Sequence, residues 1–166
     1  VAIHAAIARQ FGPYKLSIHS GSDKFSVYPA IVRQTRGLVH LKTAGTSYLE
    51  ALRTIAPLAP DLFREIYVYA RDRFDTDRAT YHTSSSLERA PLPQDVPDAD
   101  LVKLLDQFDA RQILHITFGS VLREKGDNSR LHFQERLADL LRTHAEDYAR
   151  NLEAHFLKHL RPFVAI

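Results

Sequence analysis

Cysteine and methionine are both absent from this chain of 166 residues. Without cysteine, the chain can form neither a disulfide framework nor a thiolate zinc site, so a metal ion would need histidine, carboxylate or water as ligands. The chain also begins at Val1 and not at an initiator methionine. We therefore expect a processed or truncated piece of a longer protein.

Long apolar runs are absent as well. No stretch approaches the length that spans a membrane, and the chain does not open with the pattern of a signal peptide. We therefore expect a cytoplasmic protein that does not bind membranes. A composition of 45% hydrophobic and 25% charged residues is typical of one well-buried core. We expect residues 1–166 to form a single domain, or a fragment of a larger one.

A strong net charge is also lacking, because the formal charge of +2 is too small to indicate nucleic-acid binding. The charge is distributed unevenly along the chain. Residues 1–60 hold seven Lys and Arg against only Asp23 and Glu50, which leaves +5 there and −3 on the remainder. A small anion such as a carboxylate or phosphate would be attracted to the positive part, and scattered charges on a solvated surface are the alternative.

Glycine, proline and capping residues divide the chain into short alternating segments. Gly12-Pro13 and Pro57 end helices, Pro29 suits the first turn of a helix, and Ser47 to Glu50 has the capping-box pattern. The expected strands are 14–19 and 37–41, and the expected helices with two defined ends are 2–11, 47–56, 60–78 and 111–122. Three further helices are expected. One begins at about residue 29, one begins at residue 101 with Asp98 or Asp100 as its cap, and one begins at residue 137 and ends at Pro162. A surface loop is expected at 84–98. This order predicts an α/β fold with parallel strands.

The segment 111–122 admits two interpretations. Its β-branched content favours a strand, whereas Leu114, Phe118 and Val121 or Leu122 recur at helical spacing. No turn signal separates the segment from the preceding helix, so we predict a helix.

Each of the two expected strands ends in a histidine followed by small polar residues. The first is Tyr14 to His19, and the second runs from Gly37 to His40. Two neighbouring parallel strands that each place an imidazole at the carboxyl end can direct both rings at one ion or ligand. His19 and His40 are therefore candidate metal ligands. Neutral imidazole suits Zn, Mn, Fe, Co or Ni alike, and the alternative is a pair of turn histidines bonded to backbone carbonyls.

Four strings of this chain resemble the carboxyl-terminal part of the tagaturonate epimerases. In chain order they are HSGSDKFSVYP (19–29), HLKTAGTSYLEAL (40–52), LFREIYVYARDRF (62–74) and RQILHITFGSVL (111–122). The likeness runs from about Ala2 to the end of the chain, and the first two strings are the most specific. It implies the C-terminal portion of a TIM-barrel-like (β/α) fold with parallel strands, followed by long C-terminal helices.

The same resemblance implies a divalent-metal-dependent isomerase that interconverts the sugar acids D-tagaturonate and D-fructuronate. It also implies that the catalytic acid and base carboxylates and one metal-binding histidine lie upstream of this chain. The missing N-terminal part of the barrel, or a homo-oligomer partner, would complete the site. Two other readings stay open, namely another metal-dependent sugar isomerase or aldolase on a barrel, and a non-catalytic fragment that binds a sugar acid.

The polar residues that follow His19 and His40 are the candidate substrate ligands, and they comprise Ser20, Ser22, Asp23, Lys24, Lys42, Thr43 and Ser47. Either lysine could pair with the substrate carboxylate or stabilise a developing enolate oxygen, and the hydroxyl groups could bind sugar hydroxyls. The alternatives are solvated surface lysines and residues that cap turns and helices.

The chemistry of a ketouronate favours retro-aldol cleavage. The carbon that is epimerised lies one bond beyond the position that the ketone activates, so simple enolisation cannot exchange its hydrogen. A transient oxidation would need a nicotinamide, and this chain has no GxGxxG turn.

Three further histidines lie on expected helices. His155 and His159 have the i, i+4 spacing of a metal site, but they lack the neighbouring glutamate of a metalloprotease motif and lie where a helix C-terminus favours histidine. We therefore expect no metal there, and we expect His115 to be a buried histidine.

Overall fold

The fold is given by a computed structural model of the chain. It describes residues 1–12, 14–19, 25–42, 45–126 and 132–164, without the side chain of His19. The chain divides into two compact units, which we describe separately. Unit 1 comprises residues 1–44 and 152–166, and unit 2 comprises residues 45–151.

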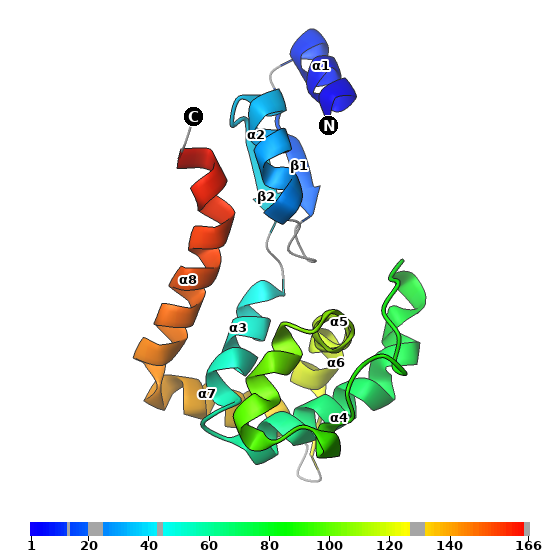
Figure 1. Ribbon diagram of the computed structural model, residues 1–166, viewed down its shortest axis with the longest axis vertical. Coiled ribbons are helices and arrows are strands. Elements are labelled where there is room, and N and C mark those ends of the chain that lie inside the picture. Colours follow the sequence, from blue (N-terminus) through cyan, green and yellow to red (C-terminus); the bar gives the residue numbers. More distant parts are fainter. Residues whose placement is uncertain (13, 20–24, 43–44, 127–131, 165–166) are drawn as a thin grey trace. The chain divides into compact units, whose positions relative to one another are not determined.

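Unit 1 is built on a sheet of two parallel strands (Figure 1). Its elements are α1 (Ala2–Phe11), β1 (Leu16–His19), the 3-10 helix η1 (Phe25–Val27), α2 (Tyr28–Thr35), β2 (Val39–Lys42) and the carboxyl-terminal part of α8 (Ala145–Val164). Helix α2 provides the crossover between the strands and contacts β2, while α1 contacts both α2 and β1. The predicted parallel α/β order is confirmed.

Proline and left-handed residues set the ends of α2, as their conformational limits require. Pro29 lies in the first turn, where its missing N–H costs no helical hydrogen bond. Arg36 and Gly37 take positive φ angles of 52° and 77°, which end the helix and turn the chain towards β2. The buried side chains Tyr28, Ile31 and Val32 face the interior of the unit.

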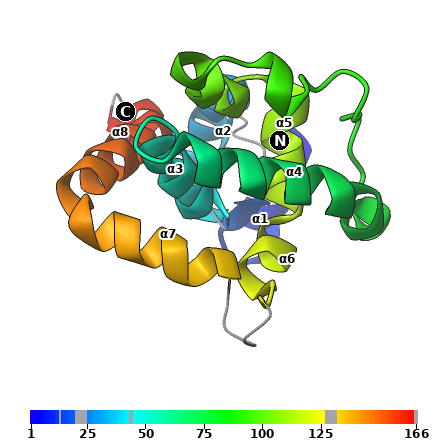
Figure 2. The same ribbon diagram turned by 90° about the horizontal axis from the view of Figure 1, so that it is seen from below.

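The elements of unit 2 within its described residues are helices, apart from a single β-bridge residue at Lys125. Its elements are α3 (Thr46–Ile55), α4 (Pro60–Asp77), η2 (Arg78–Thr80), η3 (Pro93–Asp95), η4 (Asp98–Leu105), α5 (Phe108–Ile116), α6 (Phe118–Arg123), α7 (His132–Thr143) and the first part of α8. Helix α4 is central, because it contacts α3, α5, α6 and the 3-10 segments (Figure 2). Phe63, Phe74 and Leu114 are fully buried, and burial of one such side chain contributes about 1.5–3 kcal/mol.

Two predicted helix caps are wrong. Gly45, with φ +84°, is the residue before α3, so the helix begins at Thr46 and Ser47 lies exposed in its first turn without capping it. Neither Asp98 nor Asp100 caps the next helix by a side-chain hydrogen bond, and that helix is the 3-10 segment η4. Asp98 instead accepts a hydrogen bond from Arg64 at 2.5 Å.

Two predicted helices are each divided in the structure. The helical prediction for 111–122 is correct, but Thr117 separates α5 from α6, and its hydroxyl bonds to the carbonyl of Ile113. The long carboxyl-terminal helix divides at His144 into α7 and α8. Pro162 does not end α8, which continues to Val164, because a proline in the last turn removes a single helical hydrogen bond. The predicted loop at 84–98 holds, apart from η3 and the first residue of η4.

Candidate functional site

The candidate site lies at the carboxyl end of the two parallel strands in unit 1. The register pairs His19 with Lys42 and Ser17 with His40. His19 is therefore the last residue of β1, whereas His40 lies two positions before the end of β2. Side chains alternate along a strand, and Ser17, His40 and Lys42 are exposed where Leu16 and Leu41 are half-buried. The exposed face of the sheet thus carries His40, and His19 is paired in the register with Lys42, two residues after His40.

His40 is accessible to a ligand. Its side chain is exposed, and within the part of the chain that the structure describes its ring has no hydrogen bond or ion pair with protein. Lys42, also exposed, follows two residues later on the same face. An imidazole in this position keeps a nitrogen lone pair that can coordinate a cation.

Most of the predicted substrate ligands lie outside the described residues. These are Ser20, Ser22, Asp23, Lys24 and Thr43, whose roles stay predictions. Ser47 is described and lies in unit 2, where its backbone carbonyl accepts a hydrogen bond from the Tyr148 hydroxyl at 3.2 Å. Its own hydroxyl is exposed on the first turn of α3.

A complete metal site is not present within the described residues. No group of three or more His, Asp or Glu side chains among the described ones could hold an ion, and the side chain of His19 is not among them. His40 supplies a suitable imidazole donor, so a cation there would need further ligands from His19 and from groups outside the described residues. In the same ranges, no helix has the length and apolar character needed to cross a bilayer.

The start of α3 in unit 2 is shaped by His115, which the sequence predicts to be buried and which is half-buried in the structure. The ring of His115, on α5, lies so close to Gly45 that a Cβ atom there would be 2.7 Å from its Cε1 and 3.0 Å from its Nδ1. Gly45 also has a left-handed φ of +84°. Only glycine fits both constraints, which explains the residue before α3.

Tyr48, in the first turn of α3, lies in the same region of unit 2. Its ring centroid is 6.2 Å from that of Phe118, and the Phe118 ring in turn lies 6.5 Å from His115. Burial raises the pKa of the Tyr48 phenol, and its hydroxyl has no hydrogen-bond partner in the described structure. The phenol is therefore neutral at physiological pH.

The two histidines of α8 contact each other. In unit 1, Nε2 of His159 lies 3.0 Å from Nε2 of His155, and Nδ1 of His159 lies 2.9 Å from the Tyr28 hydroxyl. The helical spacing of the histidines was visible in the sequence, whereas nothing in the sequence marks Tyr28 as their partner.

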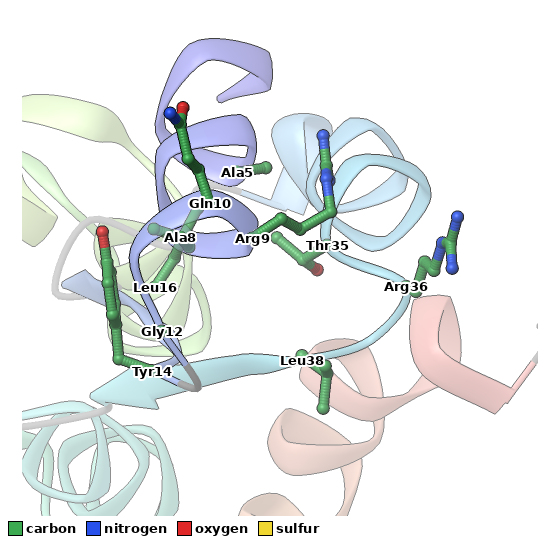
Figure 3. A pocket seen from close by; sticks show the side chains of 10 residues that line it. All are labelled: Ala5, Ala8, Arg9, Gln10, Gly12, Tyr14, Leu16, Thr35, Arg36 and Leu38. Carbon is green, nitrogen blue, oxygen red and sulfur yellow. The ribbon is translucent and has the colours of Figure 1, made fainter.

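Unit 1 also contains a hollow of about 500 Å³ beside α1 (Figure 3). It is bounded by Ala5 and Arg9 on α1, by Tyr14 and Leu16 at the start of β1, and by Leu38 before β2. It therefore lies at the amino ends of the strands. The hollow is therefore separate from the candidate site, which lies towards the carboxyl ends of the strands.

Comparisons with known proteins identify the class of enzyme to which the chain is related. Its relatives are epimerases named for two ketouronates. Residues 1–163 match the tagaturonate epimerase family, and the chain belongs to that family.

Two relatives define the extent of the likeness. The tagaturonate/fructuronate epimerase of Thermotoga maritima is 45% identical over 160 residues, which cover 96% of this chain and 32% of that protein. Crystal structures of fructuronate-tagaturonate epimerase UxaE from Cohnella laeviribosi, native and in complex with glycerol, are 44% identical, with a TM-score of 0.91 over 98% of this chain and 33% of theirs. The chain thus spans about a third of the length of the relatives that it matches.

Proposed function

We propose that this chain supplies part of the active site of a divalent-metal-dependent epimerase that converts D-tagaturonate to D-fructuronate. The observation that carries the proposal is the exposed His40 on β2, next to a parallel strand that ends at His19, in a chain that belongs to the tagaturonate epimerase family. The α/β order fits the carboxyl-terminal portion of a TIM-barrel-like fold, which is the framework that we propose for the complete enzyme.

In this proposal His19 and His40 hold the cation. When bound, a Zn, Mn, Fe, Co or Ni ion would supply Lewis-acid polarisation of the substrate ketone. Each ligating ring requires its second nitrogen to be fixed by a carbonyl or carboxylate.

The residues of this chain would bind and orient the sugar acid. Lys42 is exposed on the same face as His40 and would pair with the substrate carboxylate, and Lys24 is proposed for the same task. Thr43 and Ser47 are further proposed ligands of the sugar acid. The proposed hydroxyl ligands Ser20 and Ser22, with the carboxylate of Asp23, would fix the sugar hydroxyls.

The proposed reaction is a retro-aldol cleavage followed by re-addition. A base removes the proton from the hydroxyl on the carbon β to the ketone, the carbonyl of an aldehyde forms there, and the bond between the α and β carbons breaks. The electron pair of that bond enters the enediolate of the ketone fragment. Rotation of the aldehyde exposes its other face, the carbon–carbon bond forms again, and an acid returns the proton. The base and acid are expected in the part of the enzyme upstream of this chain.

The site would be completed by another part of the barrel or by a second subunit. Helix α1 exposes large apolar side chains, with Ile3 at 75% and Phe11 at 72% exposure. A sheet of two strands also buries too little surface to be stable alone. Both features support a partner that covers unit 1, as does the fact that the chain spans about a third of its relatives. The cytoplasmic location stays a prediction.

Metal binding tests the proposed ligands. The chain is titrated calorimetrically with Mn²⁺, Ni²⁺, Co²⁺ and Zn²⁺, and we expect one ion per chain. His40→Ala should weaken binding by more than about tenfold, because it removes a donor from the ion. His82→Ala, which changes an exposed histidine of unit 2, is the matched control and should bind normally. Equal binding by both variants would remove the metal site from the proposal.

Turnover tests the reaction. D-Tagaturonate is incubated with the chain alone and with the chain plus the remaining two thirds of the Thermotoga maritima relative, expressed separately, and D-fructuronate is followed by NMR. We expect product in the second mixture, without deuterium from heavy water at the epimerised carbon, since its C–H bond never breaks in a retro-aldol step. Deuterium at that carbon would exclude this mechanism.

Two other outcomes would favour the alternative functions. Turnover of other ketoses in place of ketouronates would favour another sugar isomerase or aldolase. Metal-dependent binding of a sugar acid without turnover would favour a non-catalytic fragment.

A further inference from the structure

The hollow of unit 1 has the size of a small-molecule site. Its volume of about 500 Å³ lies within the range of pockets that hold small organic ligands. It is lined by residues of α1, of the start of β1 and of the segment that joins α2 to β2 (Figure 3). The large exposed side chains of α1 that we assign to a covering partner, Ile3 and Phe11, do not line it. The hollow is therefore distinct from that apolar face.

Small and apolar residues shape the hollow. Ala5 and Ala8 lie one turn apart on the face of α1 that lines it, and their methyl groups fill little space. At Gly12 a Cβ atom would meet nothing within 4 Å, so the backbone there leaves the space open as well. Leu16 and Leu38 add apolar surface from the side of the strands. The hollow thus offers an apolar surface to the body of a ligand.

The charge of the lining has one sign. Among the described residues that line the hollow, Arg9 and Arg36 are charged and none is acidic. Arg9 reaches from α1 to α2, where it donates a hydrogen bond to the backbone carbonyl of Gln34 at 2.9 Å. A guanidinium has five N–H donors, so this bond leaves others for a ligand. In the part of the chain that the structure describes, neither arginine forms an ion pair, so the positive charge of the lining is not balanced there.

Two uncharged polar side chains also line the hollow. They are the amide of Gln10 and the phenol of Tyr14, and within the described structure neither side chain has a hydrogen-bond partner. Both groups can donate a hydrogen bond to an anionic oxygen. The Tyr14 ring, which is 49% exposed, also presents an apolar surface.

This combination favours a small organic anion with an apolar body. A guanidinium binds a carboxylate or phosphate through paired N–H donors. The apolar part of such a ligand would cover Ala5, Ala8 and Leu38 and remove them from water. A sugar acid fits poorly, because its hydroxyl groups would lose their hydrogen bonds to water against alanine and leucine side chains.

We propose that the hollow of unit 1 binds a small organic anion with an aromatic or branched-alkyl body, whose carboxylate or phosphate group pairs with Arg9 and Arg36. The site lies at the amino ends of the strands, whereas the proposed metal and substrate ligands lie towards their carboxyl ends. It shares no residue with the proposed epimerase site and does not depend on that function. Because the ligand contacts α1 and the end of α2 together, it slows hydrogen exchange of the α1 amides.

Matched probes test the class of ligand. Phenylacetate carries the charge and the apolar body, phenylacetamide carries the body alone, and acetate carries the charge alone. Each is titrated into the ¹⁵N-labelled chain, and the backbone amide shifts of unit 1 are followed by NMR. We expect saturable binding of phenylacetate with slower hydrogen exchange in α1, about tenfold weaker binding of phenylacetamide, and no saturation with acetate.

The outcome of these titrations decides the proposal. Phenyl phosphate is titrated in the same way, and the tighter of the two phenyl anions identifies the preferred anionic group. Equal binding of phenylacetate and phenylacetamide would overturn the proposal, since charge would then play no part. Absence of saturable binding by both phenyl anions, or shifts confined to residues away from the hollow, would overturn it as well.

Variants locate the binding. Arg36→Asn removes one charge at a left-handed position that asparagine tolerates, and it should weaken phenylacetate binding by about tenfold. Ala8→Leu fills part of the hollow and should weaken binding by at least as much. Arg33→Gln, which changes an exposed arginine of α2 outside the lining, is the matched control and should bind normally. Unchanged binding by either lining variant would contradict the proposed site.

A protein segment is the competing occupant. The phenylacetate titration is repeated with the remaining two thirds of the Thermotoga maritima relative, once size-exclusion chromatography shows that the two parts associate. Binding that persists in this complex supports a ligand site. Loss of binding would identify the hollow as a protein interface and overturn the proposal. Formation of D-fructuronate in the same mixture reports separately on the proposed function.

Discussion

The two units differ in how far they bury their apolar side chains. In unit 2, the helices around α4 enclose a continuous core in which Phe63, Ile66 and Leu114 have no exposed surface. In unit 1, a small sheet and its helices leave Phe11 72% exposed. A helical core of this kind is self-sufficient, whereas a two-stranded sheet gains stability from whatever covers it. We therefore expect the unit that carries the proposed chemistry to be the less stable of the two.

The sharpest test of this difference in burial is a phenylalanine-to-alanine substitution made separately in each unit. Phe63→Ala removes a fully buried ring from unit 2 and should lower the free energy of unfolding by about 3–5 kcal/mol. Phe11→Ala removes an exposed ring from unit 1 and should change it by less than about 0.5 kcal/mol. Guanidinium unfolding, followed by circular dichroism, measures both. A similar loss for the two variants would mean that the face of α1 is covered in solution.

Backbone constraint also differs between the units. Gly45→Ala in unit 2 places a side chain on a left-handed residue and brings it into collision with His115, so it should lower the free energy of unfolding by about 2–3 kcal/mol. Gly12 in unit 1 also has a positive φ, of 142°, but a Cβ atom added there would meet no atom within 4 Å. Gly12→Ala should therefore lower the free energy of unfolding by about 1 kcal/mol less than Gly45→Ala does, and thermal unfolding of the two variants measures this difference. Equal costs would show that the ring of His115 moves aside freely.

A buried carboxylate fixes the long loop of unit 2. Asp109 is 5% exposed and accepts hydrogen bonds from Arg89 at 2.8 Å and from the N–H of Ser86 at 2.9 Å. The hydrogen bond from Arg89, aided by that of Ser86, lowers the pKa of Asp109. Asp109→Asn should therefore lower the free energy of unfolding by about 1–2 kcal/mol at neutral pH.

The pH dependence of this cost has a definite sign. A carboxyl whose pKa is lowered in the folded chain stabilises it fully above the unfolded value of about 3.9, and the stabilisation is lost as the pH falls through the lower folded value. The difference between wild type and Asp109→Asn should therefore shrink in acid. Asp106→Asn, which changes an exposed partner of Arg53, is the control and should cost less than about 1 kcal/mol at any pH. A cost for Asp109→Asn that does not vary with pH would contradict this role.

Local signals in the sequence predicted most of the elements correctly. Pro29 and Gly37 delimit α2 and the return to β2 because their backbone limits act within a few residues. The breaks at Thr117 and His144 were missed, since no glycine or proline marks them. The start of α3 was placed at Ser47, because the capping-box pattern outweighed a preceding glycine whose role depends on His115, 70 positions away.

The candidate site was predictable only in part. The positions of His19 and His40 at adjacent parallel strands follow from the alternation of short segments, and the register agrees with that order. The contact between Tyr28 and His159 could not be predicted, because it depends on packing between elements at opposite ends of the chain. The same limit applies to the exposure of α1, which reflects the small number of strands in unit 1.

The contact between Gly45 and His115 constrains the order in which these two positions can change. A side chain at position 45 collides with the imidazole, whereas a smaller residue at position 115 would first make room for it. Replacement of the histidine before position 45 becomes alanine would remove this collision, whereas the left-handed φ of +84° at position 45 would stay unfavourable for alanine. The two positions should consequently vary together among related sequences, with histidine at 115 accompanied by glycine at 45.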